Sequence, residues 1–422
     1  MQTQQRNWAG NYQYKAAAIH HPKTLEEVQG LVRQGTKIRA LGTRHCFNDI
    51  ADSDQELISL EHFDHVLSLD KERLTVTVEG GIRYGQASQF LHREGFALHN
   101  LASLPHISIA GACATATHGS GNKNGNLATA VSAMELVTAD GEVITLSREK
   151  DEDSFHGMVV SLGGFGVITK LTLDIQPTFD VQQFVYENLP FHELEHHFDD
   201  ITAGGYSVSL FTDWGKETID QVWLKRRVTN GGTVEAEPVY FGATLATRHL
   251  HPIAGISAEN CTEQMGIPGP WHERLPHFRM DHTPSSGEEL QSEYFVPRKY
   301  AYRALLAIQR LHEQVTQLLQ ISEVRTIAAD DLWMSPCHKQ DCVAIHITWV
   351  KDEPAVMRLL PTVEAALAPF EVRPHWGKLF AMPPDQLGAR YEKLQDFRRL
   401  LAEYDPQGKF RNAFLDRFIF GS

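Results

Sequence analysis

Two stretches decide the fold: Leu41-Gly42-Thr43-Arg44-His45-Cys46-Phe47-Asn48 and Gly111-Ala112-Cys113-Ala114-Thr115-Ala116-Thr117-His118-Gly119-Ser120-Gly121. The first places a histidine in a loop, and a neutral imidazole is a competent nucleophile toward an electrophilic carbon. The second consists of small residues, which let backbone N–H groups approach a pyrophosphate closely, where larger side chains would collide. Together they predict two loops that hold a large phosphate-bearing cofactor.

The glycine spacing excludes a Rossmann dinucleotide site. That fingerprint needs G-x-G-x-x-G directly after a strand and at the start of a helix, with an acidic residue about 20 positions later. Gly163-Gly164-Phe165-Gly166 does not have this spacing, and Gly119-Ser120-Gly121 lacks the third glycine and a following helix pattern. The cofactor must therefore be held in another way.

Composition limits the partners. The chain has 422 residues, enough for two or three domains, and its 42% hydrophobic and 22% charged residues are ordinary for a globular protein. The formal net charge of −14 argues against a nucleic-acid or anionic-membrane partner, because either requires a basic face. No apolar run approaches the roughly 18 residues of a spanning helix.

Cysteine usage and the start of the sequence predict a compartment. Five cysteines (Cys46, Cys113, Cys261, Cys337 and Cys342) are an odd number without C-x-x-C spacing, which predicts reduced thiols in a cytoplasmic protein. Residues 1–7 contain no apolar h-region, so we expect no Sec signal.

The first part of the chain alternates strand and helix patterns. Apolar periodicity predicts helices over 24–32 and 84–93 and strands over 37–41, 74–78 and 166–175. Strands over 130–138 and 143–146 are joined by Asp140-Gly141, a strong hairpin signal. Pro177 is the expected end of this first domain.

The middle third has a different character. We expect strands over 206–211, 221–226, 323–328 and 343–350, with helices over 297–319 and 355–367. This mixture predicts an α+β cap, an antiparallel sheet covered by helices on one face. The predicted division is 1–177 for the cofactor domain and 178–375 for the cap, with 376–422 returning to the first domain.

His192-Glu193-Leu194-Glu195-His196 matches the zinc-protease pattern H-E-x-x-H. Two histidines four apart on a helix can bind zinc. The segment is strongly polar, however, and it lacks the apolar residues that pack a protease helix below its metal. We interpret it as a solvated helix face and predict no metal; a zinc hydrolase stays as a remote alternative.

Longer stretches carry a family resemblance: Asn7-Trp8-Ala9-Gly10-Asn11, Asn100 to Ser108, Asn260 to Gln264 and Pro268 to Arg279. With the two loops, they make the chain similar to flavoprotein oxidases of the vanillyl-alcohol-oxidase fold, and among these to the bacterial alditol oxidases. The resemblance implies an α+β protein, in which an FAD-binding domain of that type is joined to an α+β substrate (cap) domain.

The resemblance also implies the cofactor and its contacts. FAD is expected, bonded covalently through His45. The family tends to have a small residue at the position of Arg44. A second covalent bond through Cys113 is not expected, because alditol oxidases use one bond, so Cys113 is interpreted as a small buried thiol. The expected cofactor-binding residues are Leu41, Gly42, Thr43, Arg44, His45, Cys46, Phe47, Ser103, Ser108, Gly111, Thr115, Thr117, His118, Gly119, Ser120, Val167 and Ile168.

Alternation along two predicted strands suggests a substrate site. Glu323 and Arg325 are two apart and leave the same face of their strand, as do His346 and Thr348. If these strands are neighbours facing the flavin, their polar groups share one cavity, which suits a polyol because each hydroxyl both donates and accepts. An isolated Glu323–Arg325 pair would be structural, but the family uses these positions for substrate. The other expected substrate-binding residues are Ser103, Gln291 and Lys378.

By resemblance, the reaction is oxidation of the terminal hydroxyl of a linear alditol such as xylitol or sorbitol, with oxygen reduced to hydrogen peroxide. Arg325 and Lys378 would stabilise charge on the reacting oxygen, Glu323 and His346 would hold the next hydroxyl, and either Lys378 or His346 would assist proton removal. A monomer is expected. An aldonolactone oxidase or dehydrogenase, and a non-catalytic flavin-binding protein, stay as alternatives.

Overall fold

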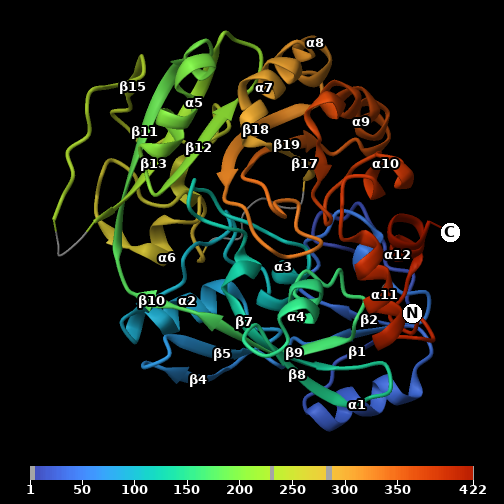
Figure 1. Cartoon of the computed structure of the whole chain (residues 1–422). Helices are drawn as coiled ribbons and strands as arrows, with labels where there is room; N and C mark the ends of the chain where they lie inside the picture. Colours follow the sequence, from blue (N-terminus) through green and yellow to red (C-terminus); the bar gives the residue numbers. More distant parts are fainter. Residues whose placement is uncertain (1–4, 229–231, 282–287, 422) are drawn as a thin grey trace.

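The computed structural model describes residues 5–228, 232–281 and 288–421. Two sheet-based parts lie on either side of a central loop region that contains α3 (Ile109–Ala114), as Figure 1 shows. None of the helices in the described residues is long and apolar enough to cross a membrane. All five cysteines are free thiols, which confirms the prediction of reduced thiols.

The N-terminal part contains two sheets. A parallel sheet has the order β1-β3-β2, and an antiparallel five-stranded sheet has the order β4-β5-β9-β7-β8. Their strands are β1 (Ala18–His20), β2 (Ile38–Leu41), β3 (Glu56–Ser59), β4 (Val66–Asp70), β5 (Thr75–Glu79), β7 (Val131–Val137), β8 (Val143–Ser147) and β9 (Val167–Asp174). The short strands β6 (Phe96–Ala97) and β10 (Gln176–Pro177) pair with each other, and the helices are α1 (Leu25–Gln34), α2 (Tyr84–Arg93) and α4 (Glu152–Met158).

The second part is one antiparallel sheet of ten strands in the order β14-β15-β11-β13-β12-β18-β19-β17-β20, with β16 beside β11. The strands are β11 (Asp180–Pro190), β12 (Ser207–Thr212), β13 (Thr218–Val228), β14 (Val239–Tyr240), β15 (Ala243–Leu245), β16 (Gly269–Pro270), β17 (Glu289–Pro297), β18 (Leu319–Ile327), β19 (Cys342–Val350) and β20 (Arg373–Pro374). Helices α5 (Glu193–Ala203), α7 (Ala301–Gln309), α8 (His312–Val315) and α9 (Glu353–Leu367) lie along its outer side (Figure 1), while α6 (Trp271–Arg274) lies nearer α2.

The C-terminal segment lies against the N-terminal part of the structure (Figure 1). It contains α10 (Pro384–Gly388), α11 (Leu394–Tyr404), α12 (Ala413–Leu415) and a final π-helical turn, Asp416–Phe420. The Asn412 amide donates to the backbone carbonyls of Asp49, Ile50 and Asp52 at 3.2, 3.1 and 2.8 Å. Residues more than 350 positions apart are thereby joined next to β2.

Most predicted elements of the first part are confirmed. The helix predicted over 84–93 is α2, and α1 begins after Thr24, whose hydroxyl caps the helix by accepting from the Glu27 N–H. Strands β7 and β8 form the expected hairpin. The limits 1–177, 178–375 and 376–422 stay a prediction, although the ten-stranded sheet begins at Asp180 and ends at Pro374.

The helix predicted over 297–319 is wrong as one element. The chain forms α7 and α8, separated at Arg310 and Leu311, and β18 begins at Leu319. The Val350 N–H donates to the Leu318 carbonyl at 2.7 Å, so the last residues of the expected helix pair with β19. Strand pairing therefore overrides a helical apolar pattern here.

Candidate active site

A cavity of roughly 440 Å³ lies where the two parts meet. One wall, called here the cofactor wall, is formed by segments 39–47, 102–108 and 111–118. The opposite wall, called the substrate wall, is formed by side chains of β17, β18 and β19 and by the segment 375–378. Both predicted loops and all predicted substrate residues therefore line a single cavity.

The cofactor wall has room for a large ligand because of its small residues. A Cβ added at Gly42 would lie 2.7 Å from the Ser108 hydroxyl oxygen, and one added at Gly111 would lie 2.9 Å from the same atom. Such distances are below van der Waals contact, so a side chain at either glycine would fill the space beside Ser108. This arrangement fits a dinucleotide that needs close backbone approach.

His45 lies on the cofactor wall between an indole and a hydroxyl. Its ring stacks on Trp8 at 5.3 Å between ring centroids, and its Nδ1 lies 3.2 Å from the Thr43 hydroxyl oxygen. Burial, assisted by the nearby His106, lowers the pKa of His45 to about 4. The imidazole is therefore neutral at ordinary pH, the form that can act as a nucleophile.

Thirteen of the predicted cofactor residues line the cavity: Leu41, Gly42, Thr43, Arg44, His45, Cys46, Phe47, Ser103, Ser108, Gly111, Thr115, Thr117 and His118. Gly119, Ser120, Val167 and Ile168 lie outside its lining. The Ser120 carbonyl accepts from the Asn100 amide at 3.0 Å, and Val167 is buried in a hydrophobic cluster between β9 and α1. Cofactor binding by these four residues stays a prediction.

Cys113 also lies outside the lining. It is buried within α3, and its sulfur is 3.6 Å from the Tyr84 hydroxyl oxygen. Burial raises the pKa of its thiol to about 12. A protonated thiol turned away from the cavity agrees with the interpretation of Cys113 as a small buried residue.

The substrate wall is built by register. Strands β18 and β19 are neighbours, with Glu323 directly opposite His346, and β17 places Gln291 opposite Thr348. Because side chains alternate between faces, Glu323 and Arg325 point into the same cavity as His346 and Thr348. Strands β18 and β19 are therefore neighbours, as the predicted substrate site requires.

Glu293 is the residue that the sequence analysis missed. It is 1% exposed, and its carboxylate accepts from the Arg325 guanidinium at 2.7 Å and the Lys378 ammonium at 2.7 Å. The His118 Nε2 lies 3.1 Å from the same carboxylate. The signal was present, since Glu293 is two residues after Gln291 on β17 and therefore shares its face.

The charges of this cluster balance one another. Burial would raise the pKa of Glu293, but Lys378, His118 and Arg325 hold it well below its usual range. Burial lowers the pKa of Lys378, while the Glu293 charge opposes that shift. Glu293 is therefore the counter-ion that keeps a guanidinium and an ammonium charged inside the protein.

The Glu323–Arg325 ion pair is secondary. Their closest atoms, Arg325 Nε and Glu323 Oε1, are 3.5 Å apart, whereas Glu323 Oε1 lies 2.7 Å from His277 Nε2. Arg325 also donates to the Ser103 hydroxyl at 3.2 Å. Glu323 is thus bound more closely by His277, and Arg325 more closely by Glu293, than either is by the other. This argues against a purely structural Glu323–Arg325 pair.

His346 links Lys378 to Thr348. The Lys378 Nζ is 2.7 Å from His346 Nδ1, and His346 Nε2 is 3.1 Å from the Thr348 hydroxyl oxygen. Burial and the Lys378 charge lower the pKa of His346 to about 4. An ammonium can only donate, so Nδ1 of the neutral ring accepts and Nε2–H donates to Thr348.

The H-E-x-x-H segment lies on the surface, away from the cavity. His192 precedes α5 and His196 is exposed on it, whereas Leu194, Phe198 and Ile201 pack inward. The segment is therefore the solvated helix face that was expected.

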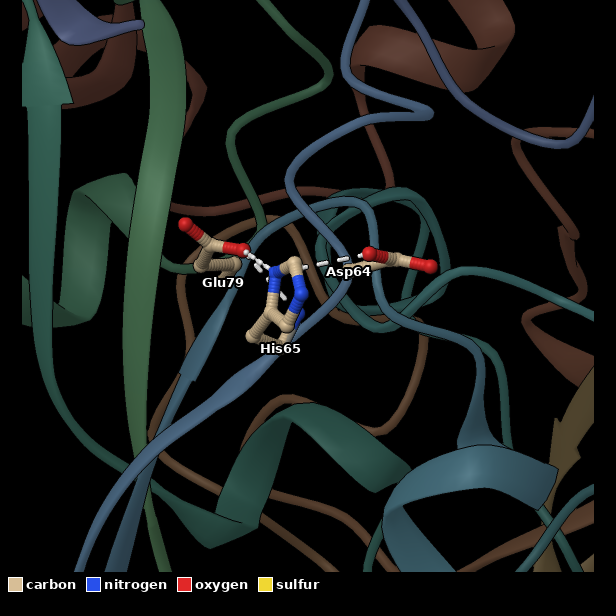
Figure 2. Close-up of side chains that lie close together, drawn as sticks. All are labelled: Asp64, His65 and Glu79. Atoms are coloured by element: carbon tan, nitrogen blue, oxygen red, sulfur yellow. Dashed lines mark hydrogen bonds and ion pairs between the residues drawn. The ribbon is translucent and has the colours of Figure 1, made fainter. Parts of the chain in front are cut away.

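Within the described residues, one group has metal-ligand geometry, namely Asp64, His65 and Glu79 (Figure 2). Its ligand atoms lie within 4.8 Å of one another. His65 Nδ1 is 2.9 Å from the Glu79 carboxylate and 3.4 Å from Asp64, and its side chain is 73% exposed. The contacts of this surface group are explained by ion pairing, and it lies outside the cavity lining.

Comparison with known proteins gives the following relatives. Residues 16–147 match the family described as FAD binding domain, and residues 285–418 match D-arabinono-1,4-lactone oxidase. The chain is 48% identical to an alditol oxidase of Streptomyces sp. (strain IKD472 / FERM P-14339), with 100% of both chains covered. It is 26% identical to the L-gulonolactone oxidase of Mus musculus, with 98% of each covered.

Among solved structures, a cholesterol oxidase from B. sterolicum is similar with a TM-score of 0.79, covering 99% of this chain and 97% of that chain at 16% identity. At this identity the likeness shows the fold alone. Together with the FAD binding domain match, it confirms the predicted fold class, an α+β protein with an FAD-binding domain of the vanillyl-alcohol-oxidase type.

Proposed function

The chain belongs to the alditol oxidase family of FAD-dependent oxidoreductases, and from this we propose that it oxidises the terminal hydroxyl of a linear alditol such as xylitol or sorbitol to the aldose. Oxygen is the proposed electron acceptor, and hydrogen peroxide the second product. The single observation that carries the proposal is the charged substrate wall centred on Glu293, which faces the His45 loop across one cavity.

The cofactor wall is the proposed FAD site. When bound, FAD supplies the hydride acceptor and passes the electrons to oxygen. Gly42, Gly111 and Ser108 leave the space for close backbone approach, and neutral His45 is the proposed point of covalent attachment. Trp8 holds the His45 ring by stacking.

The substrate wall is the proposed polyol site. The carboxylate of Glu323 accepts from substrate hydroxyls, while Gln291 and Thr348 offer groups that both donate and accept. These residues extend along three adjacent strands, so they can pair several hydroxyls of one linear chain. Fixing the orientation of the substrate in this way contributes to the rate because the reacting carbon is held in place.

Arg325 and Lys378 act on the reacting oxygen. Both are positive and share Glu293, so they present donors to the negative charge that develops as the hydroxyl proton leaves. For the Lys378–His346 pair to take that proton, Lys378 Nζ would pass one of its own protons to His346 Nδ1 along their 2.7 Å hydrogen bond, and the neutral amine so formed would accept the proton of the hydroxyl. Ser103 is held by Arg325 and lies where the two walls meet.

The test begins with acid precipitation of the purified protein and the peptide mass of the segment containing His45. A flavin mass on that peptide is expected. Flavin released into the supernatant would leave an FAD enzyme without the His45 bond. Turnover on xylitol, measured as peroxide formation, then tests the reaction; turnover without peroxide but with an artificial acceptor would make the enzyme a dehydrogenase.

A second candidate is an aldonolactone oxidase. Its support is the match of residues 285–418, which include most of the substrate wall, to D-arabinono-1,4-lactone oxidase. A lactone ring offers fewer adjacent hydroxyl donors than a linear alditol, so Glu323 has less to bind. We expect kcat/KM to be higher for xylitol than for a sugar 1,4-lactone, and the reverse order would favour the second candidate.

We also propose that the protein works as a monomer in the cytoplasm, with domains at 1–177 and 178–375 and the segment 376–422 on the first domain. The five free thiols agree with a reducing compartment. Analytical ultracentrifugation of the purified protein tests the monomer, and limited proteolysis near residue 177 tests the division.

A further inference from the structure

A buried lysine stands behind the substrate wall. Lys225 on β13 is 1% exposed, and among the described residues no carboxylate lies within ion-pair distance of it. Its Nζ is instead 2.6 Å from the Leu275 carbonyl oxygen, 3.1 Å from the Pro276 carbonyl oxygen and 3.2 Å from His277 Nδ1. A lysine in this position requires a reason, because burying an ammonium is unfavourable.

The three contacts suit the charged form. An ammonium has three N–H donors and no acceptor, and here it meets three acceptors; a neutral amine would leave one of them without a donor. Burial lowers the pKa of Lys225 to about 7, against the attraction of the Glu323 charge. The two carbonyls compensate for much of the lost hydration and also fix where the third N–H points.

That third N–H determines the tautomer of His277. Because Lys225 can only donate, His277 Nδ1 must accept, and the proton of the neutral ring is then on Nε2. His277 Nε2 lies 2.7 Å from Glu323 Oε1, so this proton is donated to the carboxylate. The ring is also held between Phe211 and Trp223, at 5.5 and 5.2 Å between centroids.

From this geometry we infer that Lys225 and His277 are positioning residues for Glu323: the lysine sets the histidine tautomer, and the histidine fixes one carboxylate oxygen so that the other is presented to the hydroxyls of the substrate. The inference rests on the proposed function, in which Glu323 binds a polyol hydroxyl. It adds His277 in the cavity lining and Lys225 behind it, two residues whose effect is on substrate selectivity and is transmitted through one carboxylate.

The test compares two substrates on the FAD-loaded enzyme: xylitol, and pentane-1,5-diol, which has the terminal hydroxyl but no inner hydroxyls. Selectivity is the ratio of their kcat/KM values. In Lys225→Met the donor to His277 is lost at nearly unchanged side-chain length, and we expect selectivity to fall roughly 10-fold to 100-fold, as for a hydrogen bond to a charged group. Lys225→Gln keeps a neutral donor, so it should retain more of the selectivity than Lys225→Met.

Two further variants isolate the route through Glu323. In a Glu323→Gln background, adding Lys225→Met should change selectivity less than twofold, because the carboxylate that the pair positions is already gone. Ser209→Ala is the matched control: its hydroxyl oxygen lies 3.5 Å from His277 Nε2 in the same buried region, too far for a strong bond. We expect Ser209→Ala to keep the selectivity of the wild-type enzyme.

The outcomes separate clearly. A Lys225→Met variant that loses activity on both substrates in equal proportion has only lost structure, and this would overturn the inference; so would equal further losses in the Glu323→Gln background. If the wild-type enzyme itself shows a selectivity near one, the proposed role of Glu323 is wrong and the inference falls with it. A wild-type preference for xylitol that Lys225→Met keeps would contradict the inference alone.

Discussion

The two walls of the cavity are built by different means. The cofactor wall consists of loops with small residues, where the important feature is the space beside Ser108 and the single imidazole of His45. The substrate wall consists of long strands whose alternate side chains carry charge, with Glu293, Arg325 and Lys378 buried together. One wall binds by leaving room for backbone contact, and the other binds by side-chain charge.

The difference shows where a substitution will be costly. On the substrate wall each charged group depends on its partners, because a buried charge without a counter-ion is strongly unfavourable. On the cofactor wall the residues are more independent of one another, and a substitution acts through local space or backbone strain. The following predictions test this contrast, starting with the largest expected effect.

Glu293→Leu should be the most damaging change. It leaves the Arg325 guanidinium and the Lys378 ammonium buried without their shared carboxylate, and we expect the free energy of unfolding to fall by about 3–5 kcal/mol. Glu364→Gln is the control: Glu364 is also buried, but it accepts from the Tyr294 hydroxyl and the Ala381 N–H rather than from a cation. Denaturant unfolding of both variants measures the difference; equal losses would mean that charge pairing is not what distinguishes the substrate wall.

Lys378→Met removes one donor to the reacting oxygen. We expect kcat to fall by about 10²–10³-fold, roughly 2.7–4 kcal/mol, while flavin content is unchanged, because the Lys378 ammonium contacts Glu293 and His346 rather than His45. Stopped-flow measurement of flavin reduction by xylitol isolates the effect from the later reaction with oxygen. A variant with full turnover would exclude Lys378 from the reaction.

Acid should weaken the substrate wall through its neutral histidines. His277 and His346 are 5% and 8% exposed, and burial lowers the pKa of each to about 4 from the ordinary 6.5. The unfolded chain therefore binds more protons than the folded one between these values, so stability is lost as pH falls below 6.5. Each histidine should contribute a loss of about 2 kcal/mol between pH 7 and pH 5.

Thermal unfolding at the two pH values measures this loss. The matched variant His277→Gln should reduce the pH dependence by about the share of one histidine. A pH dependence that is identical in wild type and variant would show that other groups set the acid limit.

Arg44→Gly should have the smallest effect and should be favourable. Arg44 has a φ of 64°, a left-handed conformation that a side chain disfavours by about 1–2 kcal/mol, part of which glycine loses again through its greater freedom in the unfolded chain. We expect a net gain of about 0.5 kcal/mol with FAD content retained. Arg44→Ala keeps the strain and should show no gain; a gain of equal size there would assign the effect to the charge instead.

The same contrast governs what sequence can predict. Alternation on β18 and β19 placed Glu323, Arg325, His346 and Thr348 on one face, and the ladder register bears this out. Glu293 was missed because β17 was not among the predicted strands, and because its three partners reach it from other segments. Such partnerships are created by tertiary contact, which local patterns do not contain.

The cofactor wall was predicted by family resemblance rather than by physics. That resemblance identified thirteen residues that line the cavity, but also Gly119, Ser120, Val167 and Ile168, which do not line it. The helix predicted over 297–319 was wrong as one element, because the chain breaks between α7 and α8 and its last residues pair with β19. Local preference is overridden where a strand offers better burial.

The joining of the two chain ends has a consequence for biosynthesis. The Asn48 amide donates to the Trp376 and Lys378 carbonyls, and Asn412 holds the carbonyls at 49, 50 and 52, so part of what secures the His45 loop is made last. At about 5–20 residues per second, the ribosome needs roughly 20–70 s to proceed from residue 45 to the end of the chain. The His45 loop therefore completes its contacts only at the end of synthesis, and we expect loading of the cofactor to follow release from the ribosome.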